Sequence, residues 1–184
     1  MPFTWSKTVQ QDGTIRIVLL EGERKFVNIC LVSGETLQWE YFNGDQDQVK
    51  AWREGDYLHV VGIKNGEPVQ LKKKVDSRPW FQPLSYSLRN FLKSEGDKIS
   101  FWTIRSNTLD IYAMEAKKKA CEEIETVGGT ELAQLVEIRV KGFLSKFWHC
   151  TYWYRQQDGL FLQYQAAHGP VGTEKTTVQV ASVD

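Results

Sequence analysis

The sequence predicts a mainly β protein, built as one large curled antiparallel sheet of about a dozen short strands that forms a half-barrel or open barrel. Glycines recur at intervals of 9 to 12 residues through the first third of the chain, as turns between short strands would require. Aromatic and branched residues alternate with polar ones between these turns, and a single stretch has helical spacing. Because strands twist, a sheet of this size cannot stay flat, and one short helix near 84–93 is expected to pack on or plug its concave face.

Length and charge place the chain among ordinary globular proteins. At 184 residues it is expected to form a single domain over 1–184. Lys plus Arg (23) equals Asp plus Glu (23), which argues against a nucleic-acid binder because such proteins need a basic face. Cys30, Cys121 and Cys150 are odd in number and form no C-x-x-C pair, so no disulfide framework is predicted.

The chain carries no pattern of a membrane span or an export signal. It begins MPFTWSKTVQQDG, without a basic and then apolar leader, and no apolar run approaches about 18 residues. As given, the expected compartment is the cytoplasm, or the periplasm if an export signal has been removed.

The first third reads as a series of hairpins. Its glycines mark the turns: Gly13, Gly22, Gly34, Gly44, Gly55 and Gly66. In ETLQWEYF, residues 35–42, Leu37, Trp39 and Tyr41 alternate with polar residues, which predicts a strand with one buried face. Asn65-Gly66, between two strand-like segments, favours a type I′ turn.

The chain leaves the sheet in the segment DSRPWFQPLSYSLRNFLKSEGD, residues 76–97. Two prolines bracket Trp80 and Phe81, and apolar residues then recur at helical spacing. These residues are Leu84, Leu88, Phe91 and Leu92. The pattern predicts the short helix at about 84–93.

Strands are predicted again in the second half, with one ambiguous segment. Residues 112–125, YAMEAKKKACEEIE, are rich in strong helix formers. Their apolar residues do not form a helical stripe, and the flanking turns suit strands, so a strand is favoured while a helix stays open. The lysine triplets at 72–74 and 117–119 are interpreted as strand residues that oppose edge-to-edge pairing, with each triplet split between two faces.

Residues 49–180 contain several stretches that resemble uncharacterised bacterial proteins in which an antiparallel sheet wraps as a half-barrel around a helical plug. These stretches are WREGDYLHVVGIKNGEPVQLKKKV, RPWFQPLSYSLRNF, FWTI, GFLSKFWHCTYWYRQQDGLFLQY and GPVGTEKT. The architecture is similar to that of the periplasmic lipoprotein-carrier class, and the resemblance implies a hollow that holds acyl chains. It brings no catalytic motif.

Strand geometry separates the neighbours His149 and Cys150. Successive side chains of a strand point to opposite faces, so these two cannot share a metal or act as a nucleophile and base. Trp148, Cys150, Tyr152 and Tyr154 are expected on one face of this strand. In the next strand, Leu160, Leu162 and Tyr164 are expected to alternate with Phe161, Gln163 and Gln165.

The predicted function is a non-enzymatic binding module for a hydrophobic small molecule or acyl chain in the hollow of the curled sheet. The predicted ligand-binding residues are aromatic: Trp80, Phe81, Phe91, Trp102, Trp148, Tyr152 and Tyr154. No catalytic motif, metal site or cofactor is predicted, the expected partner is a lipid or similar molecule, and a protein partner is unknown. The alternatives are a protein-interaction domain without a ligand cavity, and an enzyme working through His149 or His168 with a carboxylate from another strand.

Overall fold

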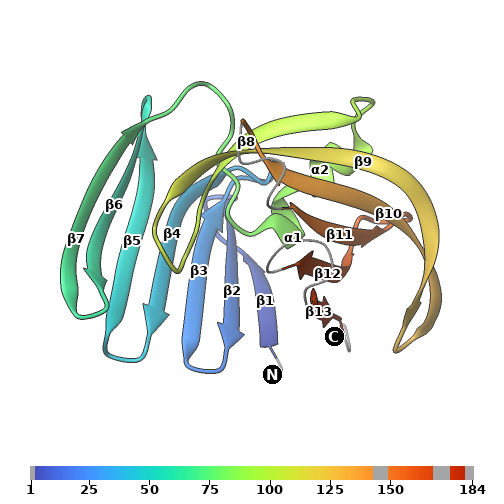
Figure 1. Cartoon of the computed structure of the whole chain (residues 1–184), viewed down its shortest axis with the longest axis horizontal. Helices are drawn as coiled ribbons and strands as arrows, with labels where there is room; N and C mark the ends of the chain where they lie inside the picture. Colours follow the sequence, from blue (N-terminus) through green and yellow to red (C-terminus); the bar gives the residue numbers. More distant parts are fainter. Residues whose placement is uncertain (1–2, 143–148, 168–174, 181–184) are drawn as a thin grey trace. The chain divides into compact units, whose positions relative to one another are not determined.

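The computed structural model describes residues 3–142, 149–167 and 175–180. In this part of the chain the strands form two antiparallel sheets, of seven and six strands (Figure 1). Neither sheet is closed, because its first and last described strands do not pair with each other. The predicted fold class, mainly β and antiparallel with one short helical region, is confirmed. The strands expected in one large sheet are divided between two sheets.

The chain divides into two compact units. The first unit comprises Met1–Ser87 and Trp102–Ile111, and the second comprises Leu88–Phe101 and Tyr112–Asp184. The single domain expected from the length stays a prediction.

The seven-stranded sheet lies in the first unit, and its strands follow one another in chain order (Figure 1). The strands are β1 (Phe3–Val9), β2 (Ile15–Glu21), β3 (Arg24–Cys30), β4 (Thr36–Asn43), β5 (Asp47–Glu54), β6 (Tyr57–Lys64) and β7 (Glu67–Lys74). All six glycines that marked the predicted turns have φ angles between 53° and 92°. These angles favour glycine, and the predicted series of hairpins is confirmed.

The turn at Asn65-Gly66 has the predicted geometry. β6 ends at Lys64 and β7 begins at Glu67, so the loop has two residues. Both residues have positive φ angles, 53° and 78°, as a type I′ turn requires.

The edge strand β7 that follows is exposed along most of its length and carries Pro68 and the lysine triplet 72–74. Proline and lysine both oppose the addition of another strand, which agrees with the interpretation of this triplet.

The two faces of the seven-stranded sheet differ in burial. On one face, which we call the buried face, side chains of β2 to β6 are almost completely covered: Ile15, Ile17, Asn28, Cys30, Trp39, Tyr41, Val49, Ala51, Leu58 and Val60. The other face, which we call the open face, has only Val27 buried among the residues that β2 to β7 place on it. This contrast identifies the buried face as the core side of the sheet.

Leu37 does not lie on the buried face, where the predicted alternation placed it. Trp39 and Tyr41 are buried as expected, but Leu37 is exposed and Thr36 is buried instead. The register between β3 and β4 shifts at Cys30, which pairs with Thr36 rather than Leu37. This bulge reverses the sides of the two residues at the start of β4.

The first helical segment, α1 (Leu84–Ser87), packs against the buried face. Tyr86 belongs to one cluster with Ile15, Ile17 and Cys30. The end of α1 approaches the β3–β4 turn so closely that a Cβ atom on Gly34 would lie 2.5 Å from the Ser87 carbonyl oxygen. The turn therefore needs glycine both for its φ of +92° and for this approach.

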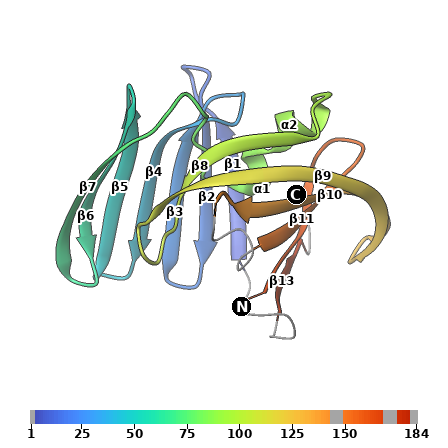
Figure 2. The ribbon, with the colours of Figure 1, turned by 45° about the horizontal axis from the view of Figure 1, so that its top comes forward.

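The six-stranded sheet has the order β13-β12-β11-β10-β9-β8. Its strands are β8 (Lys98–Ile104), β9 (Ile111–Thr126), β10 (Gly129–Val140), β11 (His149–Arg155), β12 (Phe161–Ala167) and β13 (Lys175–Gln179). The ambiguous segment 112–125 lies within β9, so the favoured strand prediction is confirmed. The register of β9 and β10 shifts between Gln134 and Val136, and Figures 1 and 2 show the long β9–β10 ribbon bending toward its tip.

The second helical segment, α2 (Arg89–Lys93), follows α1 after Leu88. Together they confirm the helical region predicted at 84–93. Neither segment, nor any other helix among the described residues, is long and apolar enough to span a membrane.

Candidate functional site

The structure places the predicted ligand-binding residues in two groups. Trp80, Phe81 and Trp102 lie in the first unit, whereas Phe91, Tyr152 and Tyr154 lie in the second. Trp148 lies outside the described residues.

Trp80, Phe81 and Trp102 meet through their backbones. The Phe81 N–H donates to the Trp102 carbonyl at 2.9 Å, and the Trp102 N–H donates to the Pro79 carbonyl at 2.8 Å. All three side chains are buried. Each indole N–H is also satisfied, by Gln82 Oε1 at 3.1 Å for Trp80 and by Asp76 Oδ1 at 3.0 Å for Trp102. These residues are thus fixed parts of a hydrogen-bonded core.

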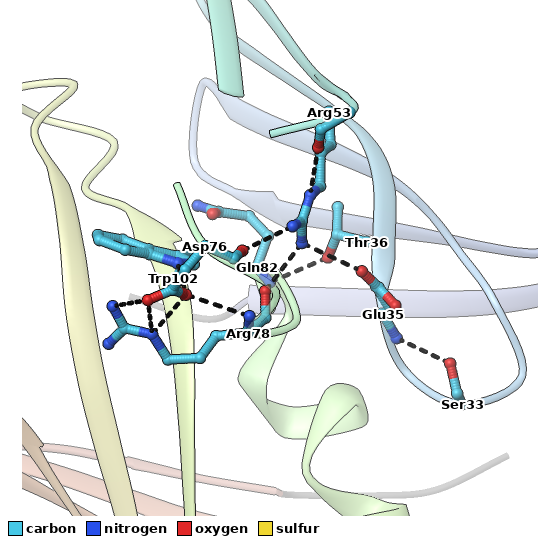
Figure 3. A network of polar contacts seen from close by, with 9 residues as sticks. Ser33, Glu35, Thr36, Arg53, Asp76, Arg78, Gln82 and Trp102 are labelled. Atoms are coloured by element: carbon cyan, nitrogen blue, oxygen red, sulfur yellow. Dashed lines mark hydrogen bonds and ion pairs between the residues drawn. The ribbon is translucent and has the colours of Figure 1, made fainter. Parts of the chain in front are cut away.

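A polar network surrounds Trp102 (Figure 3). The Arg78 guanidinium lies 4.3 Å from the centre of the Trp102 ring and donates to both Asp76 oxygens. These hydrogen bonds, together with the one from Trp102, hold the pKa of the Asp76 carboxyl well below its usual range. Asp76 therefore stays ionised and acts as an acceptor, which positions the indole rather than transferring a proton.

The Arg53 side chain of β5 binds the loop between β7 and α1, which carries Asp76 and Arg78 (Figure 3). Its guanidinium donates to the carbonyl oxygens of Asp76 at 2.7 Å and Arg78 at 2.8 Å. The side chain also donates to the Gly55 carbonyl at 3.1 Å and lies 3.5 Å from Glu35 Oε1. One side chain thus satisfies three backbone acceptors, a geometry that suits the fork of arginine.

Replacing Arg53 by methionine is expected to lower the free energy of unfolding by about 2 to 3 kcal/mol, because the carbonyls of the loop lose a charged donor. Urea unfolding followed by tryptophan fluorescence measures the change. Arg24→Met is the control, since Arg24 makes a single ion pair with Glu21 on the exposed β2–β3 turn and should change stability by less than about 0.5 kcal/mol. Equal losses of unfolding free energy in the two variants would contradict this role of Arg53.

Gln82 joins this loop to two strands. Its backbone N–H donates to Thr36 Oγ1 at 3.0 Å, while its side-chain amide donates to the Ile104 carbonyl at 2.6 Å and accepts from the Ile104 N–H at 3.0 Å. The polar atoms around the first aromatic group are therefore engaged in bonds within the first unit, and the arrangement is that of a structural core.

The second group is part of a four-ring cluster, which we call the aromatic cluster: Tyr152, Tyr154, Phe161 and Tyr164. The Tyr152 ring centre lies 4.9 Å from that of Tyr164, 5.7 Å from Phe161 and 6.0 Å from Tyr154. Burial raises the pKa values of Tyr152 and Tyr154 well above the usual value for tyrosine, so both phenols stay neutral. Contacts between aromatic rings at these distances stabilise the cluster beyond simple burial.

Phe161 and Tyr164 were predicted on opposite faces of β12, and this prediction is wrong. Tyr152 pairs with Tyr164 and Tyr154 pairs with Phe161, with a register shift between the two pairs. The shift places one extra residue in β12, so both rings face the cluster. Neither residue was selected from the sequence, because an alternating pattern gives no sign of a bulge.

Lys118 and α2 lie on the same face of the six-stranded sheet as the aromatic cluster. Lys118 pairs with Val136, Val136 with Tyr152, and Tyr152 with Tyr164, which puts the four side chains in one row across β9 to β12. The Lys118 ammonium lies 4.8 Å from the centre of the Phe91 ring and donates to the Ser94 carbonyl at 2.5 Å. The predicted residues Phe91, Tyr152 and Tyr154 thus share one face of the second unit.

Lys118 also shows how the second lysine triplet divides. Lys118 faces α2, whereas Lys119 lies 3.2 Å from Glu137 Oε1 on the opposite face. The predicted split of this triplet is confirmed. Lys118 follows the apolar residues Met114 and Ala116 at the two-residue spacing of a strand. This alternation could have placed Lys118 on the apolar face from the sequence.

At its other end α2 is held by Arg89, whose guanidinium donates to the Asp158 carbonyl at 3.1 Å. Leu92 lies against the adjacent turn, with its Cδ1 atom 3.4 Å from the position of a Cβ on Gly159. α2 therefore covers part of the face from β9 to the β11–β12 turn.

His149 and Cys150 face apart, as predicted. His149 is exposed and Cys150 is buried, and burial raises the pKa of the Cys150 thiol. His59 lies 3.4 Å from Glu54 Oε2 and stacks on Trp52 on the open face of the first sheet. Within the described residues, no three His, Cys, Asp or Glu side chains gather in a way that could hold a metal ion.

The fold places the chain in the broad class of antiparallel β proteins with open sheets. No family model and no curated protein sequence matches the chain. Its fold is similar to the crystal structure of a β-barrel-like protein of the domain of unknown function DUF1849 from Brucella abortus, with a TM-score of 0.59 and 10% identity. The match covers 90% of this chain and 79% of that chain, and at this identity it describes the fold alone.

Proposed function

We propose that the protein binds an amphiphilic molecule with an acyl chain, which lies on the face of the six-stranded sheet that carries the aromatic cluster. The observation that carries this proposal is the row of Lys118, Val136, Tyr152 and Tyr164 across four strands. One end of the row is cationic and the rest is apolar or aromatic. Three strand spacings give the row a length of about 14 Å.

The chemistry of the row suits an acyl chain with an anionic head. The chain would contact Val136 and the aromatic cluster, and each methylene removed from water contributes about 0.8 kcal/mol before the costs of association. The carboxylate would take the place of the Ser94 carbonyl at the Lys118 ammonium, where charge pairing strengthens the hydrogen bond. The resemblance of the sequence to half-barrel proteins similar to lipoprotein carriers favours the same ligand class.

α2 would act as the cover of this site. It has five residues, and a helix of this length has little stability of its own in water. Its contacts with the sheet include Lys118 with Phe91 and Ser94, and Arg89 with the Asp158 carbonyl. Exchange of the contacts at Lys118 for ligand contacts would move the cover without disturbing the ladder of the sheet.

Neighbouring lysines on β9 provide a matched test. Lys118→Gln is expected to weaken the binding of a long-chain fatty acid about tenfold, because one partly buried charge pair is lost. Binding of the corresponding fatty alcohol should change little. Displacement of a fluorescent fatty acid measures both affinities. Lys119→Gln, on the opposite face, should leave both unchanged.

The proposal would be contradicted if neither amphiphile binds, or if the two lysine variants change the affinity for the fatty acid equally. It would also be contradicted if native mass spectrometry of the purified protein shows no lipid under conditions that retain added fatty acid. A protein-interaction domain without a ligand cavity would then be the better hypothesis.

A further inference from the structure

The open face of the seven-stranded sheet carries more positive than negative charge. Register places five cations on it: Arg16, Lys25, Lys50, Lys72 and Lys74. It places two carboxylates there, Glu40 and Glu54. Five minus two leaves a surplus of three positive charges on a chain whose formal net charge is zero.

Apolar side chains are interspersed with these cations. Leu20 and Ile63 are each 44% exposed and Tyr57 is 36% exposed, all on the open face. Phe42 and Trp52 are half-buried on the same face. Two lysines lie over its rings: the Lys72 ammonium is 4.4 Å from the Tyr57 ring centre and the Lys25 ammonium is 5.7 Å from that of Phe42.

We propose that the open face docks on an anionic lipid bilayer. Lysine and arginine near such a surface are attracted to its negative potential, and Trp, Tyr and exposed aliphatic side chains suit the boundary between headgroups and acyl chains. The charge surplus and the exposed apolar residues occupy the same face, so one surface satisfies both interactions. This inference rests on the first unit and is independent of the acyl-chain site proposed in the second.

The arrangement of the rings favours a bilayer over single-stranded nucleic acid. Base stacking requires a free aromatic face. One face of the Trp52 ring is stacked on His59, with 5.1 Å between centres and 6° between planes, and one face of the Tyr57 ring lies beneath Lys72, so fewer ring faces are left for bases. The exposed leucine and isoleucine would also have no role in contacting a phosphate backbone.

Vesicle co-sedimentation of the full chain tests the electrostatic part. The protein is expected to bind phosphatidylcholine vesicles containing about one third phosphatidylglycerol, to bind phosphatidylcholine alone much more weakly, and to dissociate as salt is raised. Lys50→Gln with Lys72→Gln should lower the partition coefficient about 25-fold, about fivefold for each charge. The control is Lys93→Gln with Lys98→Gln, which removes two exposed charges from the second unit and should have little effect.

A second pair of variants tests the apolar part. Leu20→Ser with Ile63→Ser should weaken binding to the anionic vesicles and leave less of it resistant to high salt. Val127→Ser with Leu132→Ser is matched, because these residues are at least as exposed but belong to the second unit. The proposal is overturned if anionic vesicles do not bind, if both lysine pairs have equal effects, if both apolar pairs have equal effects, or if single-stranded RNA competes for the same lysines more strongly than vesicles do.

Discussion

Gly34→Ala is expected to lower the free energy of unfolding by about 3 kcal/mol, combining backbone strain with a steric clash. The backbone at Gly34 has a φ of +92°, which L-residues with a side chain rarely adopt. The added Cβ would also lie 2.5 Å from the Ser87 carbonyl oxygen and 2.8 Å from its Cα atom. Both neighbours are backbone atoms, so α1 itself would have to move away from the turn. Chemical denaturation of the purified variant measures the loss.

Gly13→Ala is the matched control for this prediction. The two glycines occupy equivalent positions in five-residue turns: Gly13 N–H donates to the Gln10 carbonyl, and Gly34 N–H donates to the Leu31 carbonyl. Their φ angles, +82° and +92°, are similar, but nothing lies within 4 Å of a Cβ on Gly13. Gly13→Ala should therefore cost only the strain of the backbone, about 1 kcal/mol. If both variants lose the same stability, the close approach of α1 to the turn is contradicted.

Asp47→Asn is expected to lower the free energy of unfolding at pH 7 by about 2 to 3 kcal/mol, because a buried carboxylate loses its charge and its acceptor geometry. Asp47 is 2% exposed. It accepts hydrogen bonds from the Asn65 N–H at 2.6 Å, Lys64 Nζ at 2.9 Å and Asn43 Nδ2 at 3.2 Å. The carboxylate thereby ties the β4–β5 turn to the β6–β7 turn.

Ionisation of Asp47 gives the stability of the wild-type protein a pH dependence of defined sign. Desolvation by burial raises the pKa of Asp47, but the hydrogen bonds from Asn65, Lys64 and Asn43 outweigh it and lower the pKa to about 2. Because the folded pKa lies below the usual value of 3.8 for an aspartate, the stabilisation is complete above about pH 4 and is lost as pH falls toward 2. The stability difference between wild type and Asp47→Asn should be constant from pH 7 to 5 and should shrink below pH 4.

Asp45→Asn serves as the control, since Asp45 lies in the same turn but is exposed. Its effect should stay within about 0.5 kcal/mol. A difference between wild type and Asp47→Asn that does not change between pH 5 and 3 would contradict the role of the ionised carboxylate.

Local backbone requirements made much of the first sheet predictable. Glycine at regular intervals and Asn65-Gly66 specify turns whose φ angles other residues adopt with strain, and each turn fixes the strands on both sides. The strong helix formers of 112–125 favour a helix, but this segment forms part of β9 because it pairs with β10. Tertiary pairing regularly overrides a preference of a few tenths of a kcal/mol per residue.

The candidate site was less predictable, because it depends on register. The sequence identified Phe91, Tyr152 and Tyr154 as aromatic residues of interest, but their common face follows from pairing between strands far apart in the chain. Phe161 joins the aromatic cluster only through the bulge in β12. For Trp80 and Trp102 the ligand contact stays a prediction, and their indole N–H groups are bonded to Gln82 and Asp76. Composition cannot distinguish an aromatic ring that lines a site from one that is fixed in the core.

The order of the first sheet also has a consequence for how the chain acquires its structure. Every strand from β2 to β7 pairs with the strand made just before it, so no pairing in this sheet waits for a distant segment. Such local pairing lowers the contact order and speeds folding. During synthesis, hairpins could therefore form one after another as the chain leaves the ribosome. The first unit is complete only when its last segment, Trp102–Ile111, has been made. Until then, Pro68 and the lysines of β7 would oppose pairing of the growing sheet with other nascent chains.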